Sequence, residues 1–489
     1  MAFNVDTLQP AALSEHLRRL MKRPQRHRLL HGYPLAAAMP YLVKSNSQTM
    51  ERISEMHLRA PVPNSFLIGI LPHPFCNPKI TGCGFCTFPH ETYSAARGEA
   101  VAASVVQEIQ DFARRNPQVL GLHPNAVYFG GGTANLTPPG AFLSLCRTLR
   151  NTFDTSASEV SLEGVPSRFL QGQRKLIDIM RDELPARHFR ISMGIQSFDE
   201  QRLKLMGRSG FGNAETFQLV VKYAQRCGLT TSGDLLFNQP SQSLADMLDD
   251  VERAIDIGLD QICLYHLVLF QGLGTEWSRE PQLVSNVPGN VEAAENWRVL
   301  RSYLLEQGYV QTSLTNFERQ DIYDSERRYQ YESVSFEDSY CQVVGFGPSG
   351  ISFAHCSDGS QAIKTMNPEH SAEYMQSVKV GGVACNRYFE YLPVDLQILD
   401  LTRKMASLKI DRLVFELRFG SGSWETYRDH FELFCEEKLM VKDEATFRLT
   451  PQGMFYSDSM ASMLSRQRWQ ESPRAQVMST LNDNRAGHM

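Results

Sequence analysis

The stretch that decides the fold is SFLIGILPHPFCNPKITGCGFC, which spans residues 65–86. Its apolar start predicts a buried strand. The loop after that strand carries Cys76, Cys83 and Cys86 at a C-x6-C-x2-C spacing. Three thiolates can each bind one iron of a [4Fe–4S] cluster and leave the fourth iron open. On this spacing alone, a structural zinc with His90 as fourth ligand and a loop without metal remain alternatives.

Outward from this stretch, short apolar runs alternate with helical patterns. The predicted strands span residues 65–71, 126–129, 159–162, 189–193, 234–237 and 261–267, and the predicted helices lie around 105–112, 142–149, 169–184, 214–227, 244–257 and 291–307. This alternation predicts an α/β fold with right-handed βαβ units and a parallel sheet. Six units are too few for an eight-fold barrel, so we expect a (β/α)6 partial barrel or an open doubly wound sheet. In either, functional residues gather at the carboxyl ends of the strands.

The alternation ends near residue 310, and the pattern becomes mostly helical from about residue 391. Two or three helices with a small hairpin predict a winged-helix-like C-terminal domain. We therefore divide the chain into an N-terminal arm (1–60), the barrel (61–310), an extension (311–390) and the C-terminal unit (391–489). The helices of this unit have apolar faces wider than a solvated helix needs, which predicts a lid over the substrate side of the barrel.

The composition of the chain excludes several classes of binding partner. The 489 residues include 49 basic and 54 acidic side chains, and a formal net charge of −5 disfavours binding to nucleic acid. No apolar stretch approaches the ~18 residues of a membrane span. The first twenty residues lack the pattern of a signal peptide. We therefore expect a cytoplasmic protein that binds neither nucleic acid nor membrane, and the ten cysteines are too sparse for a disulfide scaffold.

A glycine triplet follows the second predicted strand, in the segment YFGGGT at residues 128–133. Alone, such a triplet is most often a tight turn. Beside a three-cysteine loop it resembles the glycine motif of radical S-adenosylmethionine (SAM) enzymes. Further matching segments follow in order: EGVP at 163–166, RISMGIQSF at 190–198, LMGR at 205–208, DLLFNQP at 234–240, GFGPSGIS at 345–352 and LTPQG at 449–453. Over about residues 65–460, the chain resembles the oxygen-independent coproporphyrinogen oxidase-like family of radical SAM proteins.

The resemblance implies that Cys76, Cys83 and Cys86 bind a [4Fe–4S] cluster whose open iron binds SAM, and that electron delivery cleaves SAM to methionine and a 5′-deoxyadenosyl radical. It also implies two bound SAM molecules. Phe85 matches an aromatic residue beside the cluster and the adenine. Positions that match contacts of the first SAM are Gly131 and Glu163, and those that match contacts of the second are Gly132, Thr133, Gln196, Arg208, Asp234, Leu267 and Ile351. The structural alternatives are a surface ion pair for Arg208 and plain core for the two apolar residues.

The chain departs from the family pattern at three places. The usual cysteine spacing is C-x3-C-x2-C, so three extra residues lie between Cys76 and Cys83. The family's Tyr-x-His before the first cysteine is replaced by Ile-Leu-Pro at residues 70–72, with His73 shifted by one position. The His-Asn-x-x-Tyr-Trp segment of the haem-chaperone relatives is absent. These departures argue against a true coproporphyrinogen oxidase and against a haem chaperone.

We therefore predict an enzyme similar to the class C radical SAM methyltransferases and cyclopropanases of natural-product biosynthesis, which transfers a methyl or methylene group from SAM to an sp2 carbon of a heteroaromatic small molecule. The alternative is an oxygen-independent coproporphyrinogen oxidase-like decarboxylase or a haem-related protein. Flavodoxin or ferredoxin is the expected electron donor. The catalytic residue is not identified. Five side chains near the strand ends could contact the substrate or be ordinary core residues: His73, His90, Tyr93, Tyr265 and His266.

Overall fold

The computed structural model describes residues 10–26, 33–35, 38–41, 65–76, 83–337, 341–355, 361–381 and 383–470. Its centre is a twelve-stranded sheet with the order β12-β11-β10-β9-β1-β2-β3-β4-β5-β6-β8-β7. Neighbouring strands from β1 to β6 pair in parallel. These six strands are β1 (Phe66–Ile70), β2 (Ala126–Phe129), β3 (Glu159–Gly164), β4 (His188–Gln196), β5 (Thr230–Phe237) and β6 (Gln261–His266). The predicted six-unit partial barrel is confirmed by strands β1 to β6. The edge strands of the whole twelve-stranded sheet are β12 and β7.

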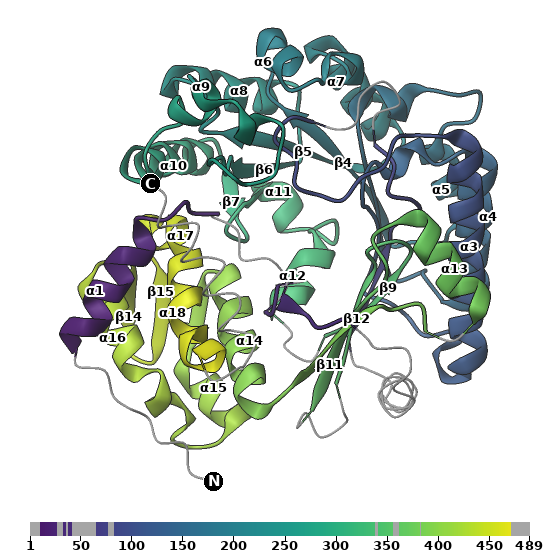
Figure 1. Cartoon of the computed structure of the whole chain (residues 1–489). Coiled ribbons are helices and arrows are strands. Elements are labelled where there is room, and N and C mark those ends of the chain that lie inside the picture. Colours follow the sequence, from purple (N-terminus) through teal and green to yellow (C-terminus); the bar gives the residue numbers. More distant parts are fainter. Residues whose placement is uncertain are drawn as a thin grey trace.

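A helix follows each of the six strands, and Figure 1 shows these helices along the outer side of the curved sheet. They are α3 (Ala95–Arg115), α4 (Pro139–Thr152), α5 (Leu176–Glu183), α7 (Ala214–Arg226), α8 (Leu244–Asp256) and α10 (Asn290–Glu306). The single helix predicted for residues 169–184 is wrong. Pro166–Leu170 forms a separate 3-10 turn, and the α-helix begins only at Leu176. Residues 171–174 are exposed and polar, so they have no apolar side chain to bury in a helix.

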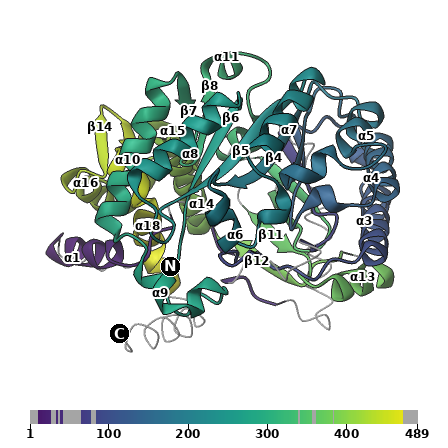
Figure 2. The same ribbon diagram turned by 90° about the horizontal axis from the view of Figure 1, so that it is seen from above.

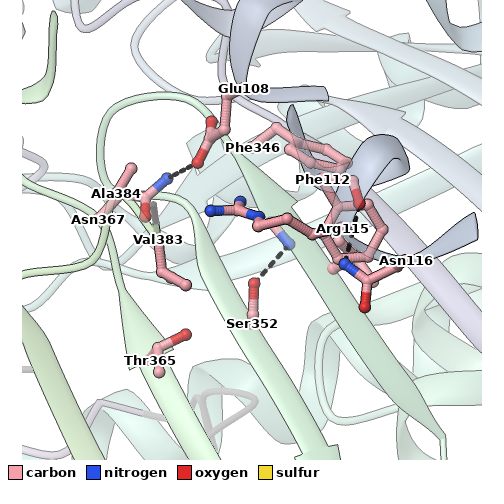
Figure 3. Close-up of a pocket in the computed structure, with 12 residues that line it drawn as sticks. Glu108, Phe112, Arg115, Asn116, Phe346, Ser352, Thr365, Asn367, Val383 and Ala384 are labelled. Atoms are coloured by element: carbon pink, nitrogen blue, oxygen red, sulfur yellow. Dashed lines mark hydrogen bonds between the residues drawn. The ribbon is translucent and has the colours of Figure 1, made fainter. Parts of the chain in front are cut away.

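Four further strands extend the sheet beyond β1. They are β9 (Gln342–Phe346), β10 (Ile351–His355), β11 (Ala362–Met366) and β12 (Arg387–Tyr391). β9 pairs in parallel with β1, whereas β10, β11 and β12 continue antiparallel. A small pocket of about 50 Å³ lies between α3 and these strands (Figure 3). There Glu108 accepts hydrogen bonds from the Gly347 backbone N–H at 2.8 Å, Asn367 at 2.7 Å and the Tyr374 hydroxyl at 2.7 Å. Glu108 thus ties the glycine-rich loop at 345–350 to α3.

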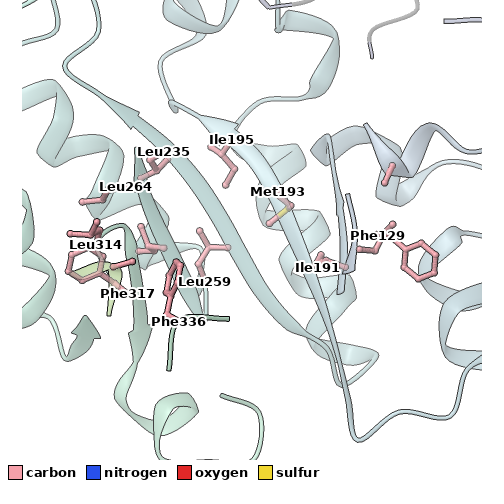
Figure 4. Close-up of a cluster of buried hydrophobic side chains, with 14 of the residues drawn as sticks. Phe129, Ile191, Met193, Ile195, Leu235, Leu259, Leu264, Leu314, Phe317 and Phe336 are labelled. Atoms are coloured by element: carbon pink, nitrogen blue, oxygen red, sulfur yellow. The ribbon is translucent and has the colours of Figure 1, made fainter. Parts of the chain in front are cut away.

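Alternate residues of the parallel strands face two different environments, because successive side chains point to opposite sides of a strand. The apolar set is buried beneath the helices (Figure 4) and includes Ile191, Met193 and Ile195 of β4, Leu235 of β5 and Leu264 of β6. The alternate positions of β4 are Arg190, Ser192, Gly194 and Gln196. The interior of the partial barrel is therefore polar, whereas the layer under the helices is apolar.

The C-terminal region is helical and carries the three-stranded antiparallel sheet β13-β15-β14. Its elements are α14 (Pro393–Ala406), β13 (Lys409–Asp411), α15 (Arg412–Phe419), α16 (Arg428–Glu436), β14 (Met440–Asp443), β15 (Thr446–Leu449), α17 (Pro451–Phe455) and α18 (Ser457–Gln470). Figures 1 and 2 show α16 and α18 at the opposite end of the molecule from α3 and α4. Leu401 and Met405 of α14 are fully buried in the same apolar cluster as the barrel. No helix in the described ranges has the length and apolar character to cross a bilayer.

Candidate active site

A cavity of about 270 Å³ occupies the interior of the partial barrel. Three of the predicted SAM-binding residues line it, namely Gly131 after β2, Glu163 on β3 and Asp234 on β5. The rest of its wall includes Tyr128, Arg190, Tyr265, Asn316, Tyr329, Tyr331 and Glu332, with Ala406 contributed by α14. The other predicted cofactor residues do not line this cavity. The predicted set therefore does not gather in this cavity alone.

Glu163 is oriented by a neighbouring strand. The Tyr128 hydroxyl donates to Glu163 Oε2 at 3.0 Å, and burial together with the Glu163 charge raises the pKa of Tyr128 well above its ordinary value. Tyr128 is therefore a permanent donor to this carboxylate. Gly131 has a φ of 111°, a backbone conformation that favours glycine. A Cβ atom on the neighbouring Gly130 would lie 3.0 Å from Glu163 Oε2, so the absence of a side chain there leaves room for a ligand beside Glu163.

The three cysteines of the loop after β1 share one environment. The Cys76 thiol is hydrogen-bonded to the Thr133 side chain, and Cys83, Cys86 and Arg208 all act electrostatically on Cys76. Burial raises the pKa of Cys76 to about 12 and also raises the pKa of Cys86. The Phe88 backbone N–H donates to Cys86 Sγ at 3.4 Å. Buried thiols of this kind become thiolates only beside a strong positive charge, which bound iron provides.

The donor set fits a [4Fe–4S] cluster. In the described ranges, no three His, Cys, Asp or Glu side chains are arranged to bind a single metal ion. A cluster instead takes one thiolate per iron and therefore needs more widely spaced thiols. A Cβ atom on Gly132 would lie 2.7 Å from the Phe75 carbonyl oxygen, so the glycine motif lies directly against the cysteine loop.

Arg208 connects the cysteines to the end of β4. Its Nη1 donates to Cys83 Sγ at 3.2 Å, and its Nη2 donates to the Gly194 carbonyl oxygen. A Cβ atom on Gly194 would lie 3.0 Å from the Gln196 amide nitrogen and 3.1 Å from Arg208 Nη2. Gln196 has a positive φ of 73°, and the pairing register shifts between Gly194 and Gln196. This bulge stores strain at the barrel mouth and brings Gln196 and Arg208 together.

The two predicted apolar contacts occupy core-like positions. Leu267 is 4% exposed and belongs to an apolar cluster with Met206 and Trp277, against which Phe85 packs. The Phe85 and Trp277 rings meet edge to face at 5.8 Å. Ile351 is a half-buried residue at the start of β10.

Of the five candidate substrate contacts, only Tyr265 lines the cavity. His73 and Tyr93 pack against Phe75, and His266 packs against Phe237 and Phe455. Burial lowers the pKa of His266 to about 3, so this half-buried side chain is uncharged at neutral pH. His90 Nδ1 donates a hydrogen bond to the Phe88 carbonyl oxygen at 2.9 Å.

Comparisons with known proteins agree with this geometry. No protein-family model matches the chain. It is 26% identical to the mitochondrial radical S-adenosyl methionine domain-containing protein 1 of Danio rerio over 370 residues, which cover 74% of each chain. It is 28% identical to the heme chaperone HemW of Haemophilus influenzae over 200 residues, covering 40% of this chain and 49% of that one. The solved structure of coproporphyrinogen III oxidase (HemN) from Escherichia coli, a radical SAM enzyme, superposes with a TM-score of 0.71 at 19% identity and covers 89% of this chain and 96% of its own. The chain is thus similar in sequence to several radical SAM proteins and shares the fold of HemN.

Within this HemN-like fold, the structure adds residues to which the sequence assigns no role. Arg190, Tyr329, Tyr331 and Glu332 all line the cavity. Arg190 could be found from the sequence, since it shares the inward face of β4 with Gln196. Tyr329 directly precedes α12 (Gln330–Glu337), and Tyr331 and Glu332 belong to it. This segment contacts a distant part of the chain, as in the hydrogen bond of the Gln330 backbone N–H to Glu159, so the local sequence does not predict its place in the barrel.

Proposed function

We propose that the protein binds a [4Fe–4S] cluster through Cys76, Cys83 and Cys86 and cleaves SAM there. The observation that carries this proposal is the 3.2 Å contact of Arg208 with Cys83, beside a polar cavity at the carboxyl ends of the strands. When bound, the cluster would supply the electron that converts SAM into methionine and a 5′-deoxyadenosyl radical.

The chain's own side chains then bind and orient SAM. Glu163, held by the Tyr128 hydroxyl, accepts hydrogen bonds from ribose hydroxyls. The backbone carbonyl group of Gly131, which lines the cavity, accepts a hydrogen bond from the amino group of SAM. Arg208 and Asp234 bind polar groups of SAM on the β4–β5 side. The buried surroundings of Arg208 exclude water from the reactive species.

For the substrate we propose a tetrapyrrole. Two observations support this class. Relatives of the chain are named coproporphyrinogen III oxidase and heme chaperone. Several aromatic side chains line the cavity, and the ring centroids of Tyr128 and Tyr331 lie 5.0 Å apart. The proposed reaction is abstraction of a hydrogen atom from a propionate side chain of the tetrapyrrole by the 5′-deoxyadenosyl radical, which becomes 5′-deoxyadenosine. The substrate radical then releases CO2, passes one electron to an external one-electron acceptor and leaves a vinyl group.

A second candidate is methylene transfer to an sp2 carbon, which needs two SAM molecules. One observation favours it. Gly131 and Glu163, assigned to the first SAM, line the cavity together with Asp234 of the second set, whereas Gln196 and Arg208 of the second set gather around Gly194 outside its lining. Two such groups of residues offer two separate binding places.

The test is turnover by the full-length protein after anaerobic reconstitution with iron and sulfide, with flavodoxin or ferredoxin as reductant. Coproporphyrinogen III and haem are offered as substrates together with SAM that carries a labelled methyl group. Release of CO2 supports decarboxylation, and label in the product supports methylene transfer. Absence of 5′-deoxyadenosine under all conditions contradicts SAM cleavage itself.

A further inference from the structure

Arg190 is a buried cation with an unsatisfied donor inside the barrel. Its side chain is 1% exposed, and it lines the cavity. Its Nε donates to Gln261 Oε1 at 2.6 Å, and its guanidinium carbon lies 4.0 Å from the centroid of the Tyr329 ring. The Nη1 atom has no hydrogen-bond partner in the described part of the chain. An unpaired donor on a buried charge is costly, so such a group normally meets a ligand or ordered water.

Two acidic side chains that interact electrostatically with Arg190, Glu159 and Glu318, are held by other donors. Glu159 interacts with His188 Nε2 at 3.3 Å, with the Gln330 backbone N–H at 2.7 Å and with the Ser161 hydroxyl at 3.0 Å. The Tyr329 backbone N–H donates to Glu318 at 3.3 Å. None of these contacts involves Arg190 Nη1, so this buried donor stays unpaired at the wall of the cavity.

We propose that Arg190 binds a carboxylate of the substrate and thereby sets the depth at which the substrate lies in the barrel. The inference rests on the proposed function and specifies its substrate as a ring system with an acidic side chain. The planar guanidinium matches a carboxylate. Phosphate, with its higher charge, is disfavoured because the carboxylates of Glu163, Asp234 and Glu332 line the same cavity.

The position of Arg190 on β4 also determines how the proposed substrate is oriented in the barrel. It is six residues before Gln196, which corresponds to roughly 20 Å along a strand. Glu163 lies between these levels, since it pairs with Ser192. A substrate held at Arg190 by its carboxylate therefore extends its ring past Tyr128 toward the cysteine loop. The side chain that binds Arg190 is consequently not the one that reacts.

The probes for the test are 2-naphthoate and its neutral amide, 2-naphthamide, added to the reconstituted full-length protein with SAM present. Calorimetry or ligand-observed NMR measures both dissociation constants. We expect the carboxylate to bind about ten-fold more tightly or better, because a charged hydrogen bond distinguishes the pair. Equal affinities, no binding of either probe, or competition by inorganic phosphate as strong as that by naphthoate would each overturn the proposal.

The matched variants are Gln261→Glu and Gln171→Glu. The first places a carboxylate of the same shape against Arg190 and should remove the preference for naphthoate over naphthamide. The second makes the same change at an exposed residue that already accepts a bond from Arg168 at 2.8 Å, and should keep the preference. A preference that survives Gln261→Glu contradicts the assignment. The wild-type comparison of the two probes stands even if that variant does not fold.

Cleavage of SAM to 5′-deoxyadenosine is measured in the same preparations. If SAM is cleaved but naphthoate shows no preference, the carboxylate site is wrong and the proposed function stands. If naphthoate is preferred but SAM is never cleaved, Arg190 binds carboxylates in a protein whose proposed function is wrong.

Discussion

Arg208 donates from Nη1 to the sulfur of Cys83 at 3.2 Å, across the barrel mouth. The guanidinium also lies 4.8 Å from the centroid of the Phe211 ring and is 6% exposed. Its Nε has no partner among the described residues. Arg208 is therefore fixed beside the cysteine loop and retains one donor for a ligand carboxylate.

For the Arg208→Ala variant we expect SAM binding to weaken about ten-fold or more, because a hydrogen bond to a charged group contributes roughly 1.5–3 kcal/mol. Equilibrium dialysis with the reconstituted protein gives both the affinity and the number of SAM molecules per chain. Arg168→Ala removes an arginine whose Nη1 bonds only to the exposed Gln171, and should leave both values unchanged. A saturating stoichiometry of one SAM in the wild type would remove the methylene-transfer candidate.

The Cys83→Ala variant should lose both the cluster and SAM cleavage, because only two thiolates remain to bind iron. Iron analysis and the visible absorption of anaerobically reconstituted protein measure cluster content, which we expect to be about four irons per wild-type chain. Cys227→Ala is the control, since this half-buried cysteine follows α7. A Cys83→Ala protein with a full cluster would show that the ligand assignment is wrong.

Gly132→Ala should disturb the cysteine loop, because the added Cβ would meet the Phe75 carbonyl oxygen at 2.7 Å. We expect reduced iron retention and a lower melting temperature. The matched control is Gly140→Ala in α4, where an added Cβ meets nothing within 4 Å. There the change should stabilise the helix by roughly 0.5–1 kcal/mol. Similar iron retention in both variants would contradict the close packing of the glycine motif on the loop.

Glu108 should make stability depend on pH. Burial raises its pKa from the ordinary 4.5 to about 7, although the donors from Gly347, Tyr374 and Asn367 oppose the shift. Between these pH values the folded state binds more protons than the unfolded state. The free energy of unfolding contributed by Glu108 therefore falls as pH rises through this window, by at most about 1.4 kcal/mol per pH unit.

Urea unfolding of the wild type and of Glu108→Gln between about pH 4.5 and 8 measures this effect. The difference in unfolding free energy, wild type minus variant, should decrease as pH rises to about 7 and then level off. Glu99→Gln, an exposed position on the same helix, should give a difference that does not change with pH. A difference that increases with pH for Glu108→Gln would reverse the assigned direction.

The sequence predicts the six parallel strands because each carries a local apolar signal, such as Ile191, Met193 and Ile195 on β4. It does not predict that β9 pairs with β1, since the pairing of Phe66 with Gln342 joins residues far apart in the chain. The cysteine loop and Glu163 follow from recognisable motifs. Tyr331 does not, because α12 enters the barrel through long-range contacts such as that of Gln330 with Glu159.

The parallel pairing of β1 with β9 also has a consequence during synthesis on the ribosome. Leu71, at the start of the cysteine loop, donates its backbone N–H to the Phe346 carbonyl oxygen at 2.9 Å. A nascent chain that has not reached β9 lacks this neighbour, so the loop cannot take its final place until most of the polypeptide has emerged. We therefore expect iron–sulfur insertion to be a late, largely post-translational event. Contacts of such high sequence separation also slow folding.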